Sequence, residues 1–175
     1  EAITQLASSV AWREDDMVGV GCGGPMTRGG ESVSPLNIPA WRGFPLRSEL
    51  SQFLGRPVVV DNDAKALALA EGRFGFAQEL SSFVAMVVST GIGGGIVLNG
   101  RLLDGRDGNA GHIGHIVVNP DGALCGCGVR GCLEAEASGS AIARRSGRPA
   151  SEATAGRTAS VRCWARSASG VKTSG

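Results

Sequence analysis

At 175 residues, the chain is long enough for one substantial domain or for parts of two. Its 17 Lys and Arg residues balance 16 Asp and Glu residues, so no charged face for nucleic acid or an anionic membrane is predicted. The hydrophobic share of 42% and the charged share of 19% are typical of a globular protein, and apolar runs such as Phe83–Val88 are much shorter than a membrane span.

Helices and strands alternate along the first half of the sequence. Apolar residues at helical spacing predict a helix over about residues 1–12, and because it has no capping residue or lead-in, we expect a chain cut within a domain. A strand over 17–21 precedes an irregular stretch rich in Gly, Pro and Ser, which is long enough to be a binding loop. A second helix over 46–54 ends at Gly55, and the apolar strand 57–61 leads directly into a third helix.

The second half begins with two strands between residues 81 and 98, separated by a tight glycine turn. Asn99-Gly100 then predicts a hairpin to a further strand, and residues 134–145 indicate a helix. Residues 151–175 have no helical or alternating period and are rich in Ser, Thr, Ala, Gly and Arg. They are either a flexible tail or the product of a reading-frame slip in a GC-rich coding sequence, and in both cases we expect little packed structure there.

Residues 111–134 contain both histidines of the chain and three of its five cysteines. One imidazole and three thiols suit a four-coordinate zinc ion. The candidate ligands are His115, Cys125, Cys127 and Cys132. Cysteines separated by one residue rarely meet disulfide geometry, and the intervening glycines (126, 128 and 131) would let the backbone bring the sulfurs together. The alternative is a set of buried thiols with a hydrogen-bonded histidine; a thiolate metal site fits a reducing, cytoplasmic compartment.

Two further stretches carry candidate chemistry. Asp63 lies where a strand passes into a helix, and the positive helix end would keep its carboxylate ionised, as a general base requires. A plain capping cluster of Asp61, Asn62 and Asp63 would have the same sequence. Ser89–Gly95 lies between two strands, so it is neither a Rossmann nor a Walker loop. Its glycines would let backbone N–H groups approach phosphate oxygens, but an ordinary glycine-rich hairpin has the same pattern.

Two segments resemble the signature regions of the ROK family (repressors, open reading frames and sugar kinases). They are STGIGGGIVLNGRLLDGRDGNAGHIGHIVVNPDGALCGCGVRGCLEAEASG and, upstream at the expected separation, VVVDNDAKALALAEGRFG. The resemblance runs from about Val18 to Arg148. It implies an α/β, actin-like (ribonuclease H-like) two-lobed sugar kinase fold with a structural zinc loop. It also implies cytoplasmic enzymes, usually homodimeric, that phosphorylate hexoses with ATP and Mg²⁺.

The same resemblance implies roles for individual residues. Asp63 would take the proton from the sugar hydroxyl that attacks the γ-phosphoryl group of ATP. The sugar would be bound by Asn62, His112, His115, Glu134 and Asn37, although Asn37 is equally well explained as a turn residue in SPLNIPAW (34–41). The nucleotide phosphates would be contacted by Thr90, Gly91, Gly93 and Gly94. Many family members have Glu at the position of His112, which leaves glucose and an N-acylmannosamine both open as substrates.

The family pattern divides the chain into a partial N-terminal lobe over 1–79, a partial C-terminal lobe over 80–150 and the tail 151–175. The family's first phosphate motif, DxGGT, does not occur in the sequence. We therefore expect this chain alone to be a poor catalyst or inactive. Two other interpretations stay open, namely the sugar-sensing part of a ROK repressor and a non-catalytic zinc-binding fragment. The expected partners are a hexose and a nucleotide, without nucleic acid or membrane.

Overall fold

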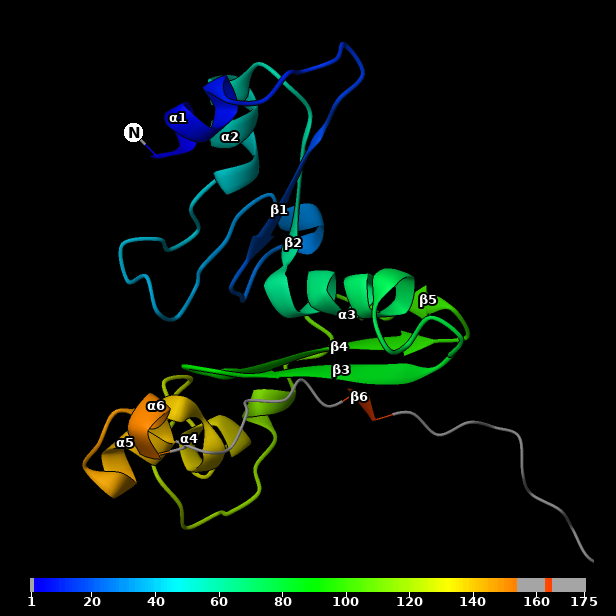
Figure 1. The fold of residues 1–175 in the computed structure, drawn as a ribbon. Helices are drawn as coiled ribbons and strands as arrows, with labels where there is room; N and C mark the ends of the chain where they lie inside the picture. The colour runs from blue at the N-terminus through cyan, green and yellow to red at the C-terminus, as the bar shows by residue number, and fades with distance from the viewer. Residues whose placement is uncertain (1, 154–162, 165–175) are drawn as a thin grey trace, which may run out of the picture. The chain divides into compact units, whose positions relative to one another are not determined.

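The computed structural model describes residues 2–153 and 163–164, which form a mixture of helices and strands (Figure 1). The chain forms two compact units, Glu1–Asp63 and Ala64–Gly175. The sequence predicted a different kind of boundary, between residues 79 and 80, where the two lobes of a complete kinase fold would meet. That boundary stays a prediction. None of the helices among the described residues is long and apolar enough to cross a lipid bilayer.

The first unit is built around two parallel strands, β1 (Val18–Cys22) and β2 (Val58–Asn62). The sequence predicted both strands, each beginning and ending one residue earlier in the chain. In the sequence between these strands lie η1 (Arg28–Gly30) and α2 (Leu46–Leu54). Helix α2 ends as predicted, because Gly55 adopts the left-handed conformation (φ 63°) and its N–H donates a hydrogen bond to the Ser51 carbonyl. Parallel pairing of Cys22 with Asn62 places the carboxyl ends of both strands at the same edge.

The core of the first unit lies on β2 and the loop after β1. Its buried apolar residues are Met26, Val33, Leu46, Val58 and Val60. Gly30 packs directly on β2, since an added Cβ would lie 2.5 Å from both the Cβ and the carbonyl oxygen of Val60. Trp41 and Phe44 stack with their ring centroids 4.8 Å apart against the same core. The irregular stretch after β1 is therefore a packed loop.

The first helix is shorter than expected. α1 spans Ala2–Ser8, whereas the apolar spacing predicted a helix to about residue 12. The hydroxyls of Ser8 and Ser9 donate hydrogen bonds to the carbonyls of Gln5 and Leu6, at 2.9 and 2.7 Å. Serine side chains that bind carbonyls of the last turn compete with continued helix, so the prediction was wrong about the end of this element.

The second unit contains an antiparallel sheet with the strand order β5-β4-β3-β6. Its strands are β3 (Phe83–Val88), β4 (Ile92–Leu98), β5 (Arg101–Leu102) and β6 (Cys163–Trp164). The two predicted strands and the Asn99-Gly100 hairpin are confirmed, with both turn residues at positive φ (50° and 73°). β6 pairs with Val84 and Ala85, so Cys163 and Trp164, together with the helical residues 151–153, are exceptions to the expectation of little packed structure after residue 150. Residues 154–162 and 165–175 lie outside the described part of the chain.

Helix α3 (Asp63–Phe74) packs on β4 through small residues. An added Cβ on Gly95 would lie 2.5 Å from the Cβ of Ala68 and 2.9 Å from the Ala64 carbonyl oxygen, and one on Gly93 would lie 3.1 Å from the Cβ of Ala64. The intervening Gly94 faces the other way, where an added Cβ would lie 2.6 Å from Cδ1 of Ile113 in η2 (Ile113–His115). The glycines of β4 therefore allow close packing on both faces of the strand.

Three short helices follow the histidine- and cysteine-containing loop. They are α4 (Leu133–Ala137), α5 (Gly139–Ser146) and α6 (Ala150–Ala153). The sequence indicated one helix over 134–145, which the structure corrects to two. Ser138 is extended (φ −69°, ψ 166°), and its side chain accepts a hydrogen bond from the Ala141 N–H, so it ends α4 and caps α5.

Candidate metal centre and phosphate-binding turn

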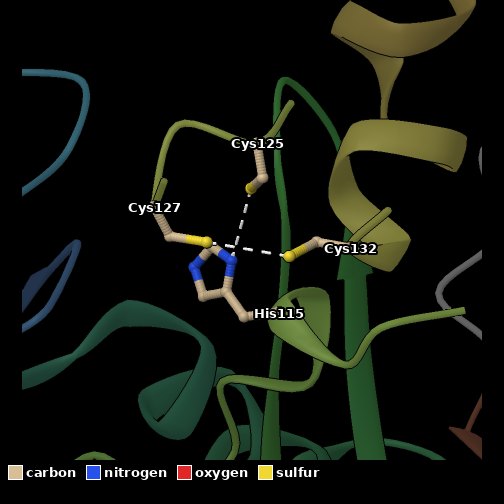
Figure 2. A group of neighbouring side chains, drawn as sticks. All are labelled: His115, Cys125, Cys127 and Cys132. Atoms are coloured by element: carbon tan, nitrogen blue, oxygen red, sulfur yellow. Dashed lines mark hydrogen bonds between the residues drawn. The ribbon is translucent and has the colours of Figure 1, made fainter. Parts of the chain in front are cut away.

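Four potential metal ligands converge between η2 and α4 (Figure 2). They are His115, Cys125, Cys127 and Cys132, and their ligand atoms all lie within 4.8 Å of one another. Nδ1 of His115 lies 3.6 Å from Sγ of Cys125, and Sγ of Cys127 lies 3.6 Å from Sγ of Cys132. The structure therefore brings together the four side chains that the sequence suggested as ligands.

Two of the separations between these atoms match those of a tetrahedral zinc site. With Zn–S distances of about 2.3 Å and Zn–N distances of about 2.0–2.1 Å, neighbouring ligand atoms lie about 3.5–3.8 Å apart. The two separations of 3.6 Å fall within this range and are much longer than a disulfide bond of about 2.05 Å. Soft thiolates with one imidazole also favour zinc over a hard cation such as Mg²⁺. The identity of the ion stays a prediction.

The three thiols differ in acidity. Burial, together with hydrogen bonds from the neighbouring Cys127 and Cys125 sulfurs, raises the pKa of Cys132 to about 12. Burial also raises the pKa of Cys125, whereas a hydrogen bond from the Val129 backbone lowers the pKa of Cys127. At neutral pH the buried Cys132 sulfur therefore carries a proton when no cation is present, and a metal must displace that proton to bind.

Backbone hydrogen bonds shape the loop that carries the cysteines. The Cys125 N–H bonds the Val129 carbonyl at 2.8 Å, and isolated bridges join Val117 to Cys132 and Leu124 to Arg130. Gly128 and Gly131 have φ of 91° and 70°, so both support the prediction that glycine lets the chain turn here. Gly126 does not, because its φ is not positive and an added Cβ would meet nothing within 4 Å.

The glycine turn between β3 and β4 is held by the helices that follow the loop with the candidate metal ligands. The Ile92 N–H donates to Oε2 of Glu134 at 2.8 Å, and the Ser89 carbonyl accepts from the Gly139 N–H at 2.7 Å. Ser140 Oγ donates to the Thr90 carbonyl at 2.9 Å. Among the residues that the structure describes, none accepts a hydrogen bond from the N–H of Thr90 or of Gly91.

Gly93 and Gly94, the other two predicted phosphate contacts, lie inside β4 rather than in the turn. Their close approach to Ala64 and Ile113 gives both glycines a packing role. A contact between either glycine and a phosphate stays a prediction.

Three predicted site residues lie in the first unit, near the carboxyl ends of β1 and β2. Asn62 is buried at the end of β2, and Asp63 is the exposed first residue of α3. An added Cβ on Gly21 would lie 3.3 Å from Cα of Asp63, and one on Gly23 would lie 3.8 Å from Oδ1 of Asn37. Burial and the charge of Asp63 raise the pKa of Cys22, the last residue of β1. Asp63 and Asn37 thus flank one short backbone segment.

The remaining predicted sugar contacts lie in the second unit, around the metal cluster. The rings of His112 and His115 meet edge to face with centroids 6.2 Å apart. Glu134 lies two residues after the ligand Cys132 and gives one carboxylate oxygen to the Ile92 N–H. Among the described residues, none contacts the other oxygen, Oε1, by a hydrogen bond or ion pair.

Sequence reasoning missed several residues that support these groups. Lys65 is buried (2% exposed) in the first turn of α3, and its Nζ lies 2.7 Å from Oδ1 of Asp104 after β5. Glu136 bonds the Ala123 N–H at 2.9 Å and so holds the turn before Cys125. The lysine interrupts an otherwise alanine- and leucine-rich helix, and this pattern could have indicated a buried charge. No comparable pattern in the sequence pointed to Glu136, Gly139 or Ser140.

Comparison with known proteins places the chain in a family. The ROK family model matches residues 1–169. The chain belongs to the ROK family. The match extends beyond Val18–Arg148 in both directions, so the expectation that ROK resemblance ends near residue 148 is wrong.

Curated ROK relatives include two kinds of sugar kinase. The chain is 47% identical over 133 residues to a glucokinase of Thermotoga maritima, covering 75% of this chain and 42% of the relative. It is also 47% identical over 111 residues to an N-acetylmannosamine kinase of Haemophilus influenzae, covering 63% of this chain and 37% of that kinase. The chain therefore spans less than half the length of the curated ROK relatives it matches.

Solved ROK structures confirm the α/β, actin-like kinase fold. A ROK family glucokinase from Streptomyces griseus, solved with glucose and AMPPNP, matches with a TM-score of 0.73 and 41% identity, covering 82% of this chain and 46% of that one. A ROK family transcriptional regulator, a homolog of the E. coli MLC protein, matches with a TM-score of 0.63 and 36% identity, covering 82% of this chain and 36% of the regulator. The fold is thus shared by kinases and regulators.

Proposed function

We propose that this chain carries part of the active site of an ATP-dependent hexose kinase. The observation that carries the proposal is the turn after β3, where the adjacent N–H groups of Thr90 and Gly91 have no acceptor among the described residues. Consecutive N–H groups in a glycine turn are suitable donors for phosphate oxygens. The likeness to a glucokinase structure with glucose and AMPPNP supports this assignment.

Asp63 is assigned as the general base. Its exposed carboxylate at the start of α3 would take the proton of a sugar hydroxyl while that oxygen bonds to the γ-phosphorus of ATP and ADP leaves. Base catalysis contributes about 10²–10⁴-fold, and positioning together with the Mg²⁺ that accompanies ATP supplies the rest.

The sugar contacts are assigned to polar side chains that can hydrogen-bond the hydroxyls of a sugar. They are Asn62, Asn37, His112, His115 and Glu134, and Oε1 of Glu134 is available for a sugar hydroxyl. A neutral imidazole at position 112 offers one donor and one acceptor, where a carboxylate only accepts. Glucose and N-acylmannosamine are the two substrates that the named relatives suggest.

Zinc is assigned a structural role at His115, Cys125, Cys127 and Cys132. When bound, it fixes the loop that carries the histidines and supplies no bond-making chemistry. Because thiolate ligands persist in reducing conditions, we assign the protein to the cytoplasm, and we carry over from the family a homodimeric assembly.

The test compares Asp63→Asn with a matched exposed variant, Asp15→Asn, in a coupled assay with ATP and either glucose or N-acetylmannosamine. The assay uses this chain and, in parallel, the equivalent substitution in a full-length relative. We expect sugar phosphate formation to fall at least about 10²-fold in the Asp63 variant, with sugar binding retained and the Asp15 variant unchanged. Unchanged turnover in the full-length Asp63 variant would refute the assignment.

A second candidate function is sugar sensing without catalysis, which the structural match to a ROK regulator favours. In that case the chain would bind a hexose while neither ATP turnover nor AMPPNP binding is detected. Stoichiometric zinc without sugar or nucleotide binding would instead indicate a non-catalytic metal-binding fragment. Calorimetric titration with each hexose and with AMPPNP therefore separates the three interpretations.

A further inference from the structure

The turn that follows β3 has little structure of its own. Its internal hydrogen bond runs from the Ser89 N–H to the Gly91 carbonyl, and Ser89 and Thr90 are exposed. Glycine in such a turn loses more conformational freedom on ordering than any other residue. Besides the β3–β4 pairing, which ends at Val88 and Ile92, contacts from other elements therefore help to set the conformation of the turn.

Those contacts come from one continuous segment. Glu134 in α4 holds the Ile92 N–H, and Gly139 and Ser140 at the start of α5 hold the Ser89 and Thr90 carbonyls. The fit at Gly139 is close, because an added Cβ would lie 2.6 Å from the Ser89 carbonyl oxygen. A side chain of α4 therefore accepts a hydrogen bond from an N–H group at the end of the turn, and residues of α5 donate hydrogen bonds to two of its carbonyls.

The same segment begins at a metal ligand. Cys132 is the N-cap residue of α4, and the next residue, Leu133, donates its N–H to the Ile116 carbonyl beside His115. The far end of α4 is fixed by Ser138, which is 2% exposed and caps α5 through the Ala141 N–H at 3.2 Å. A helix as short as the five residues of α4 is not stable alone, so its position depends on these two ends.

We propose that α4 and the first residues of α5 form a relay through which the metal-binding cluster fixes the turn Ser89–Ile92, with Glu134 and Ser140 as positioning residues. The relay rests on the proposed function only where it assigns the turn to phosphate binding. Metal bound at Cys132 holds the first turn of α4, α4 holds Ile92 through Glu134, and α5 holds Thr90 through Ser140. The metal centre thereby acts on the nucleotide side of the site as well as on the sugar side.

The first test is amide hydrogen exchange on the full chain, loaded with zinc or stripped with a chelator. Stripping is expected to speed exchange of the Ile92 amide about tenfold or more, the scale of one lost charge-assisted hydrogen bond, and exchange of the Gly139 amide, whose acceptor is a neutral carbonyl, about fivefold. The amides at 96–98, in the far half of β4, should be unaffected. If Ile92 and Gly139 keep their protection after the metal is removed, the relay is wrong.

A second variant keeps the test decisive if chelation unfolds the whole unit. Glu134→Ala in the metal-loaded protein should speed exchange at Ile92 by a similar factor, while a Co²⁺-substituted sample keeps its thiolate-to-cobalt absorption band. An unchanged Ile92 rate with an intact cobalt band would overturn the role of Glu134.

The final test uses Ser140→Ala, with Ser146→Ala at the other end of α5 as the matched control. Ser146 bonds only its local Arg148 backbone and lies outside the relay. We expect the Kd for AMPPNP to rise about fivefold or more for Ser140→Ala and to stay unchanged for Ser146→Ala. Equal affinities in the two variants would overturn the role of Ser140. If AMPPNP does not bind the unmodified chain, the proposed function fails for this chain while the exchange measurements still decide the relay.

Discussion

Gly95 offers a direct test of why β4 contains three consecutive glycines. Replacing it with Ala would place a Cβ 2.5 Å from the Cβ of Ala68, 2.9 Å from the Ala64 carbonyl oxygen and 3.0 Å from Cα of Lys65. Two of these three neighbours are backbone atoms, which cannot move aside as a flexible side chain can. Overpacking of a core costs about 1–3 kcal/mol, and we expect Gly95→Ala to fall at the upper end, near 3 kcal/mol.

The assay is urea unfolding followed by far-ultraviolet circular dichroism, with hydrogen exchange of β3 and β4 to assign the loss to the second unit. With a slope of about 1–3 kcal/mol per molar urea, the midpoint should fall by about 1 M or more. The control is Gly19→Ala in β1, where an added Cβ meets nothing within 4 Å and stability should change by less than about 0.5 kcal/mol. Equal midpoints for the two variants would refute the packing explanation.

Three further predictions concern the same unit. Asp104→Asn should destabilise it by about 1–3 kcal/mol in thermal unfolding, because it removes the carboxylate 2.7 Å from the buried Lys65 ammonium; an unchanged melting temperature would contradict the importance of this pair. Gly131→Ala should weaken zinc affinity in a competition titration, since its φ is 70° and an added Cβ would overlap the Asn119 backbone. The control, Gly126→Ala, should leave zinc affinity unchanged, because an added Cβ there meets nothing within 4 Å. A larger loss of affinity in the Gly126 variant than in the Gly131 variant would contradict the loop geometry. Zinc binding should release protons and weaken as pH falls, because burial holds the pKa of Cys132 at about 12; calorimetry that gives the same heat in buffers of different ionisation enthalpy would contradict this.

Elements with strong local signals could be predicted from the sequence. The strand ending at Asn62, the Gly55 end of α2 and the Asn99-Gly100 hairpin all follow from apolar runs or from residues that accept positive φ. The break at Ser138 was missed because serine is tolerated within a helical pattern, and only its capping bond to the Ala141 N–H reveals that two helices meet there.

The metal cluster was predictable for a different reason. Its candidate ligands, one histidine and three cysteines, are residue types that bind zinc, and their clustering within 115–132 drew attention to them. The support for the glycine turn was not predictable, because the contacts of Gly139 and Ser140 with the Ser89 and Thr90 carbonyls join residues 50 positions apart. The Gly139 contact joins two backbone atoms and requires only that Gly139 lack a Cβ, whereas the Ser140 contact needs the serine hydroxyl, which is common at the start of helices for other reasons.

The four ligand side chains all lie between positions 115 and 132, so an unfolded chain needs to close only short loops to coordinate an ion. If the cluster binds zinc as proposed, we expect the denatured state to bind it too, so that the gain in stability at high zinc concentration is smaller than mass action on the native state alone would give. During refolding, zinc added at the start will organise this segment before the distant strands have paired. A protein renatured in its presence should accordingly fold around the ion rather than acquire it last.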